Sequence, residues 1–154
     1  MTISEVLDPS DICQEEVSRR LVAAAYALIA ERYVLDRHQI GAAVLDINGG
    51  VHLGLHLDAM VGRAAVCAEA VALGTARMTT TAPLVAVAAV RFPKPTEDGS
   101  ARIVPPCGLC RELLLDHAPD MQAVLTIGAA ARLVPLTRLL PDKYVGTKWP
   151  SVSR

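Results

Sequence analysis

Residues 83 to 90, PLVAVAAV, form an unbroken apolar run that is rich in valine. A run of this kind is typical of a strand that is buried on both faces of a sheet. Such a strand needs a covering layer above it and another below it. The segment therefore predicts a sheet at the centre of a layered domain.

Periodic patterns predict helices and further strands around this run. Val17, Leu21, Ala25 and Leu28 recur at the spacing of one apolar helix face. Asn48-Gly49-Gly50 is a strong hairpin signal between two short apolar runs. The expected helices cover 12–33, 67–78, 107–117 and 137–140, and the expected strands cover 40–46, 51–57, 83–90 and 121–127, with a loop over 91–104.

This order of elements predicts an α/β fold, with a central sheet covered by helices on both faces. We expect one domain over 1–154, with 1–11 and 145–154 as tails. Apolar residues make up 52% of the 154-residue chain, which is generous for a domain of this size. A subunit interface would bury the excess, so we expect a homo-oligomer.

Charge and composition narrow the partners. The chain has 15 basic and 16 acidic residues, which are interleaved, and only 3% aromatic residues. It has no basic block or aromatic-rich basic stripe, so we expect no nucleic-acid partner. The N-terminus lacks a signal pattern, and the apolar stretch Leu21 to Ala30 is too short to span a bilayer. We therefore expect no membrane partner and a cytoplasmic location.

Two short cysteine segments carry the chemistry. Cys67-Ala68-Glu69 stands at the expected start of one helix, and Pro106-Cys107-Gly108-Leu109-Cys110 opens another. The C-x-x-C spacing lets two sulfurs reach one ion from a single helix turn, and Cys67 supplies a third. Three thiolates suit Zn²⁺, and an open fourth position for water is typical of a catalytic zinc site. Helix N-termini favour the thiolate form.

Glu69 stands two residues from a ligand, within reach of a water at the open position. We predict that it carries a proton from this water to a ring nitrogen, and later to the leaving ammonia. A Cys or His, one residue, a Glu and a later P-C-x-x-C is the signature of zinc-dependent deaminases. The pattern therefore predicts a hydrolytic deaminase.

A closed structural zinc site is the alternative interpretation. Cys13 could join Cys67, Cys107 and Cys110 as a fourth ligand, although a buried apolar role fits Cys13 better. The protein would then be a zinc-stabilised scaffold or binding protein without turnover. Glu69 would be dispensable in such a protein.

With these residues the chain resembles the cytidine deaminase superfamily, and in detail its blasticidin S deaminase branch. The resemblance runs from Ile40 to Tyr144 and is densest in CAEAVALGTA, PPCGLCRELLLDHAPD and LLPDKY. It implies a three-layer α/β/α fold with a mixed sheet, and a homotetramer whose active sites are completed by neighbouring subunits. It also implies that Cys67, Cys107 and Cys110 hold zinc and that Glu69 is the catalytic acid and base.

The same resemblance implies which residues contact the substrate. Tyr144 matches a substrate-contacting tyrosine of the blasticidin-type enzymes, and Trp149 is a candidate for the same C-terminal lid. Ala68, between Cys67 and Glu69, is a further contact position.

Other positions depart from ordinary cytidine deaminases. His56 and Asp58 replace an Asn and a Glu that hold the ribose, and His38 replaces a stacking Phe. Ala70 replaces an Arg that tempers the thiolate charge, and Arg111 is a candidate for part of that work. We expect His52 and His117, which have no such context, to be solvated.

Two substrate classes stay open. The first is a cytosine-type nucleoside or analogue, such as cytidine, deoxycytidine or blasticidin S. The second is a free base such as cytosine, an aminopurine or an aminotriazine, which the replaced ribose-binding pair favours. Both interpretations make the partner a small heterocycle and the cofactor Zn²⁺.

Overall fold

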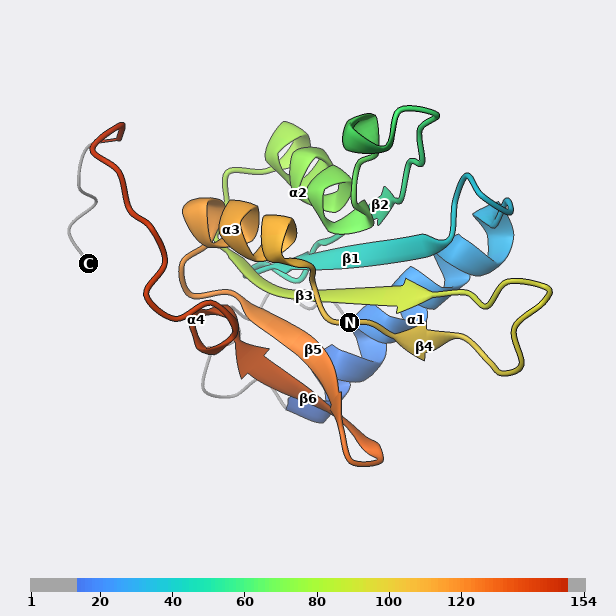
Figure 1. The fold of residues 1–154 in the computed structure, drawn as a ribbon. Coiled ribbons are helices and arrows are strands. Elements are labelled where there is room, and N and C mark those ends of the chain that lie inside the picture. The colour runs from blue at the N-terminus through green and yellow to red at the C-terminus, as the bar shows by residue number, and fades with distance from the viewer. Residues whose placement is uncertain (1–13, 150–154) are drawn as a thin grey trace.

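A computed structural model describes residues 14–149 (Figure 1). The expected tail 1–11, residues 150–154 and the candidate ligand Cys13 lie outside the described residues. The elements are α1 (Gln14–Arg32), β1 (Ile40–Asp46), β2 (Val51–Leu55), a 3₁₀ turn η1 (Gly62–Ala64), α2 (Ala68–Thr79), β3 (Leu84–Arg91), β4 (Arg102–Ile103), α3 (Gly108–His117), β5 (Gln122–Ile127), β6 (Ala130–Pro135) and α4 (Leu136–Leu139).

The strands form one mixed sheet in the order β2-β1-β3-β5-β6, and β4 pairs with the end of β3. Only β3 and β5 are parallel, and the remaining pairs are antiparallel. The central position of β3 confirms the expectation from its apolar run, because six of its eight residues are buried. Each face of the sheet is therefore covered at its centre.

Alternate residues of β1 point into two separate cores. Ala42 and Val44 pack with α2 and α3, whereas Ala43 and Leu45 pack with α1. In Figure 1, α1 lies on one face of the sheet and α2 and α3 lie on the other. The expected three-layer α/β/α architecture with a mixed sheet is confirmed.

Strand β2 and helix α2 approach each other at Gly54. A Cβ atom at Gly54 would collide with the carbonyl oxygen of Ala68 and the backbone nitrogen of Ala72. Glycine is the residue that permits such backbone contact. The contact holds the start of α2, with Glu69 in its first turn, close against the sheet.

Two strands in the structure were not expected. β6 begins directly after β5, because Ile127 pairs with Ala130 across a two-residue turn in which Gly128 has φ 63°. The glycine was a usable turn signal, but the flanking alanines carry no alternating pattern. β4 has only two residues, too few for periodicity to reveal.

His52 is not solvated as expected. Its Nε2 lies 2.7 Å from Oδ2 of Asp46, and its Nδ1 lies 3.0 Å from Oγ1 of Thr79. The side chain is only 12% exposed, because it fills the space between the hairpin and the end of α2. The expectation for His117 is confirmed, since this residue is exposed.

Candidate metal centre and active site

The N-termini of α2 and α3 bring three cysteines together. Cys67 precedes α2 and Cys107 precedes α3, each in an extended conformation, and Cys110 lies in the first turn of α3. Their sulfur atoms all lie within 4.8 Å of one another, and those of Cys67 and Cys107 are 3.5 Å apart. The sheet order places these two helix starts side by side on the same face.

Three sulfur donors at this spacing fit a zinc ion. Neither Cys67 nor Cys107 caps its helix with a side-chain hydrogen bond, so both sulfur atoms are available as ligands. The unpaired N–H groups of a helix start favour negative charge beside them. Soft thiolate ligands select zinc over the hard cations magnesium and calcium.

The cysteine pKa values show why a cation belongs here. Burial raises the pKa of Cys110 strongly, and the neighbouring Glu69, Cys67 and Cys107 raise it further. Burial also raises the pKa of Cys67. For Cys107 burial acts in the same direction, but hydrogen bonds from the Cys110 backbone and the other thiols lower the pKa overall. Three thiolates together therefore need a compensating positive ion, which deprotonates its ligands.

Glu69 is buried beside this cluster. Its side chain comes from the first turn of α2, and the residue is only 5% exposed. Burial raises the pKa of its carboxyl group, while hydrogen bonds from its own backbone N–H and from Cys110 oppose that shift. A raised pKa brings the protonated and ionised forms closer in energy near neutral pH, as proton transfer requires.

Arg111 holds in place the loop before α3, which contains Pro106 and Cys107 and is called the cysteine loop here. Its Nε donates to the carbonyl oxygen of Pro106 at 2.7 Å, and its Nη1 donates to that of Leu139 at 2.9 Å. These bonds fasten the residue before Cys107 to the end of α4. The guanidinium group also brings a positive charge close to the cysteine loop.

His38, His56 and Asp58, three of the candidate substrate residues, lie together where β1 begins and β2 ends. The N–H of His56 donates to the carbonyl oxygen of Ile40 at 2.9 Å, and that of Asp58 donates to Arg37 at 3.0 Å. Nδ1 of His38 lies 2.8 Å from the carbonyl oxygen of His56. Because a carbonyl only accepts, Nδ1 of His38 carries the hydrogen.

A short bridge places this group next to the metal ligands. Leu57 and Val66 exchange two backbone hydrogen bonds of 3.0 and 2.9 Å, and Val66 directly precedes Cys67. His56 and Asp58 therefore flank a residue that is paired to the start of the α2 segment. Nδ1 of His56 is buried and has no hydrogen-bond partner in residues 14–149.

Comparison with known proteins decides the family. No family model matches the chain. The blasticidin-S deaminase of Bacillus cereus is 36% identical over 135 residues, which are 87% of this chain and 95% of that protein. The chain belongs to the cytidine deaminase superfamily.

Similarity to cytidine deaminases supports the assignment to this superfamily. A cytidine deaminase of Mycobacterium tuberculosis is 32% identical over 109 residues, 71% of this chain and 74% of the relative. The crystal structure of a cytidine deaminase from that organism matches with a TM-score of 0.65 and 26% identity, over 82% of this chain and 96% of the other. The crystal structure of a cytidine deaminase from Burkholderia pseudomallei matches with a TM-score of 0.65 and 27% identity, over 82% of this chain and 98% of the other. This member is accordingly a hydrolytic deaminase.

The other candidate substrate contacts of this deaminase differ in burial. Ala68 is fully buried in the first turn of α2, between Cys67 and Glu69. Tyr144 is 82% exposed, and Trp149 is 53% exposed with its ring 6.1 Å from that of His117. The segment after α4, red in Figure 1, leaves the body on the side away from the loop 57–66. The segment that carries Tyr144 and the loop 57–66 therefore run in different directions from the body.

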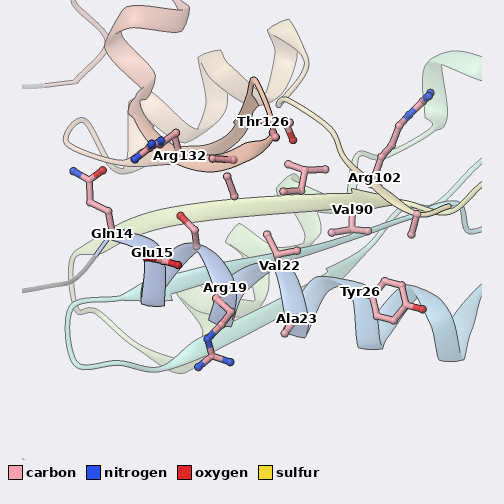
Figure 2. A pocket seen from close by; sticks show the side chains of 16 residues that line it. Gln14, Glu15, Arg19, Val22, Ala23, Tyr26, Val90, Arg102, Thr126 and Arg132 are labelled. Carbon is pink, nitrogen blue, oxygen red and sulfur yellow. The ribbon is translucent and has the colours of Figure 1, made fainter.

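A groove on the surface of the deaminase lies away from the cysteine cluster. Figure 2 shows this groove between α1 and the edge formed by β4, β5 and β6. Its volume is about 1010 Å³. Val22 and Tyr26 of α1 lie on one side of it and Thr126 on the other. It contains none of the three cysteines and not Glu69, so the deamination chemistry is not placed there.

No helix within residues 14–149 combines the length and the apolar character needed to cross a membrane.

Proposed function

We propose that this single-domain protein is a zinc-dependent deaminase of a cytosine-type nucleoside or nucleoside analogue, such as cytidine, deoxycytidine or blasticidin S. The observation that carries the proposal is the buried Glu69 beside the cluster of Cys67, Cys107 and Cys110. These cysteines would hold the ion, and zinc, when bound, lowers the pKa of a water ligand so that it attacks at neutral pH.

Glu69 provides the proton transfers of the reaction. The oxygen of water adds to the ring carbon that bears the amino group, and Glu69 takes the proton released from that water. It delivers this proton to the adjacent ring nitrogen. Glu69 then carries the remaining hydroxyl proton to the amino group, and the carbon–nitrogen bond breaks as the carbonyl forms, so that ammonia leaves. Burial raises the pKa of the Glu69 carboxyl group, which favours a group that accepts a proton and then returns it.

The group around His56 would hold the rest of the nucleoside. The buried Nδ1 of His56 lacks a partner, and a buried polar atom without a partner costs free energy. Asp58 is exposed and free to accept a further hydrogen bond from a sugar hydroxyl group. Together with His38 these residues would form the sugar subsite.

We also propose that the enzyme is a cytoplasmic homotetramer. Exposed apolar side chains gather around the cysteine-bearing helix starts, and this pattern is typical of a subunit interface; they are Leu57, Met60, Val61, Val66, Leu109 and Leu113. The ring of Tyr144 is exposed on a segment that leads away from the loop 57–66, so Tyr144 would complete the site of a neighbour. Unpaired cysteines that bind metal fit a reducing compartment.

A free base is the second candidate substrate, and two contacts favour it. Nδ1 of His38 already bonds to the carbonyl oxygen of His56. One carboxylate oxygen of Asp58 already accepts from the N–H of Ala59 at 2.8 Å. Internal partners of this kind reduce the capacity of these residues to hold a sugar.

The test is ammonia release from the zinc-loaded enzyme, followed together with the ultraviolet change of the ring. The panel is cytidine, deoxycytidine, blasticidin S, cytosine, guanine and an aminotriazine, and Glu69→Gln is the control variant. Turnover of a nucleoside or of blasticidin S that is lost in Glu69→Gln supports the proposal. Turnover of free bases alone supports the second candidate, and turnover that survives in Glu69→Gln contradicts the role of Glu69.

A further inference from the structure

Two cations fasten α4 and the segment after it to helix α3. From α3, Arg111 donates to the carbonyl oxygen of Leu139 at 2.9 Å. From the segment, Nζ of Lys143 lies 2.8 Å from Oε2 of Glu112 and 2.8 Å from Oδ1 of Asp116. The Lys143 side chain is only 16% exposed, so it lies along α3. The segment is thereby tied to the helix whose first turn carries Cys110.

The carboxylates of Glu112 and Asp116 would destabilise helix α3 if it were isolated. Glu112 and Asp116 are four residues apart, where like charges repel, and Asp116 lies near the negative end of the helix dipole. A cation between them removes both costs. Lys143 is that cation, and the two carboxylates raise the pKa of its ammonium group. The placement of these acids therefore serves the contact with Lys143.

The same ammonium group also holds the backbone at Tyr144. Nζ of Lys143 donates to the carbonyl oxygen of Tyr144 at 3.1 Å. Its three N–H donors are then matched by three acceptors, on Glu112, Asp116 and Tyr144. Asp142, one residue earlier, has φ 54°, so the chain turns sharply into this contact. The tyrosine side chain itself stays 82% exposed.

We propose that Lys143 is a positioning residue that presents Tyr144 to the substrate in a neighbouring subunit. This inference rests on the proposed function, in which Tyr144 completes the site of a neighbour. The exposed ring has no aromatic partner among residues 14–149, and it lies beside the backbone of Gly146. The path of the backbone on both sides of Tyr144 therefore influences the direction of the ring. If the segment is ordered before the substrate binds, the free energy of ordering it no longer reduces the affinity for the substrate.

The kinetic test compares Lys143→Met with Lys143→Arg in the zinc-loaded full-length enzyme. We expect Lys143→Met to raise KM by about threefold to tenfold and to leave kcat unchanged. The reason is that Tyr144 would contact the substrate equally in the bound state and in the transition state, so its displacement weakens binding alone. Lys143→Arg keeps the charge and should restore most of the affinity. Lys148→Met is the matched control, since Lys148 is an exposed lysine of the same segment with no carboxylate partner among residues 14–149.

Two further measurements separate positioning from general damage. In a Tyr144→Ala background, Lys143→Met should add less than about a twofold change in KM, because both residues act through one contact. Chymotrypsin cuts after tyrosine, and cleavage after Tyr144 should become severalfold faster in Lys143→Met and not in Lys148→Met. The cleavage readout does not depend on turnover, so it distinguishes failure of this inference from failure of the proposed function.

Independent, additive effects of Lys143→Met and Tyr144→Ala on KM would overturn the inference. So would a normal KM in either variant, or an unchanged rate of cleavage after Tyr144 in Lys143→Met.

Discussion

The sulfur atoms of Cys67 and Cys107 lie 3.5 Å apart at the starts of two different helices, although 40 residues separate them in the chain. The distance depends on the backbone contact at Gly54, which positions α2, and on Arg111, which positions the loop before α3. The site is therefore assembled by the sheet and not by the cysteine segments alone.

This geometry predicts one zinc ion for each chain. Cys107→Ala should reduce the bound metal to well below one equivalent, because two sulfur donors hold zinc far more weakly than three. Elemental analysis after dialysis measures the stoichiometry. Cobalt loading gives a second readout, since thiolate ligands produce strong charge-transfer absorption that should weaken in the variant.

Cys13→Ser tests the closed-site alternative. We expect full zinc content and unchanged activity, because a catalytic zinc site uses three protein ligands and a water, and Cys67, Cys107 and Cys110 can supply those three. Loss of zinc from this variant would make Cys13 the fourth ligand and would contradict the catalytic assignment.

Glu69→Gln should lower kcat by about 10²–10⁴-fold, the usual contribution of a positioned proton carrier. Zinc content and unfolding temperature should stay near those of the parent enzyme, because glutamine matches glutamate in shape and needs no charge in a buried position. Metal analysis and thermal unfolding on the same sample check this. A loss of zinc would show that Glu69 supports the metal and is not only a proton carrier.

Two glycines of one region should respond in opposite directions to alanine. Gly54→Ala should destabilise the fold by about 1–3 kcal/mol, because the new Cβ meets the backbone of α2. Gly74→Ala should stabilise the fold by about 0.5–1 kcal/mol, because Gly74 is inside helix α2 and a Cβ atom there would meet no neighbouring atom within 4 Å outside the backbone of that helix. Urea unfolding at matched protein concentration measures both. Equal effects would mean that the close approach of β2 and α2 is unimportant.

Asp46→Asn tests the buried hairpin contact. Burial acts to raise the pKa of Asp46, but hydrogen bonds from His52, Gly50 and Asn48 lower it below the ordinary 3.8 overall. The ionised carboxylate therefore stabilises the fold above that ordinary value, and the stabilisation is lost as the pH falls through the lowered folded-state pKa.

We expect Asp46→Asn to cost about 1–3 kcal/mol at pH 6–8, the range for hydrogen bonds to a charged group. The difference from the parent enzyme should shrink below about pH 4, because the parent then loses its charged acceptor as Asp46 is protonated. Urea unfolding across this range measures it, and a difference that is independent of pH would contradict the assigned charge.

The sequence by itself determined the chemistry and most of the elements. Cys67, Glu69, Cys107 and Cys110 could be recognised because zinc chemistry requires fixed residue types at short spacings. Helix α1 could be predicted from its apolar periodicity and strand β3 from its unbroken apolar run. Helix α2 could be predicted from helix-forming residues and helix α3 from prolines before and after its segment, and all of these signals are local. β6 was missed because an alanine-rich edge strand carries no such pattern.

Only the tertiary structure decided what lies beside what. His52 gave no sign in the sequence of its contact with Asp46 and Thr79, which come from two other elements. The pairing of His38 with His56, and the anchoring of Lys143 to α3, depend on long-range packing. Distances of this kind are set by how strands and helices pack around a common core, and spacing along the chain does not determine them.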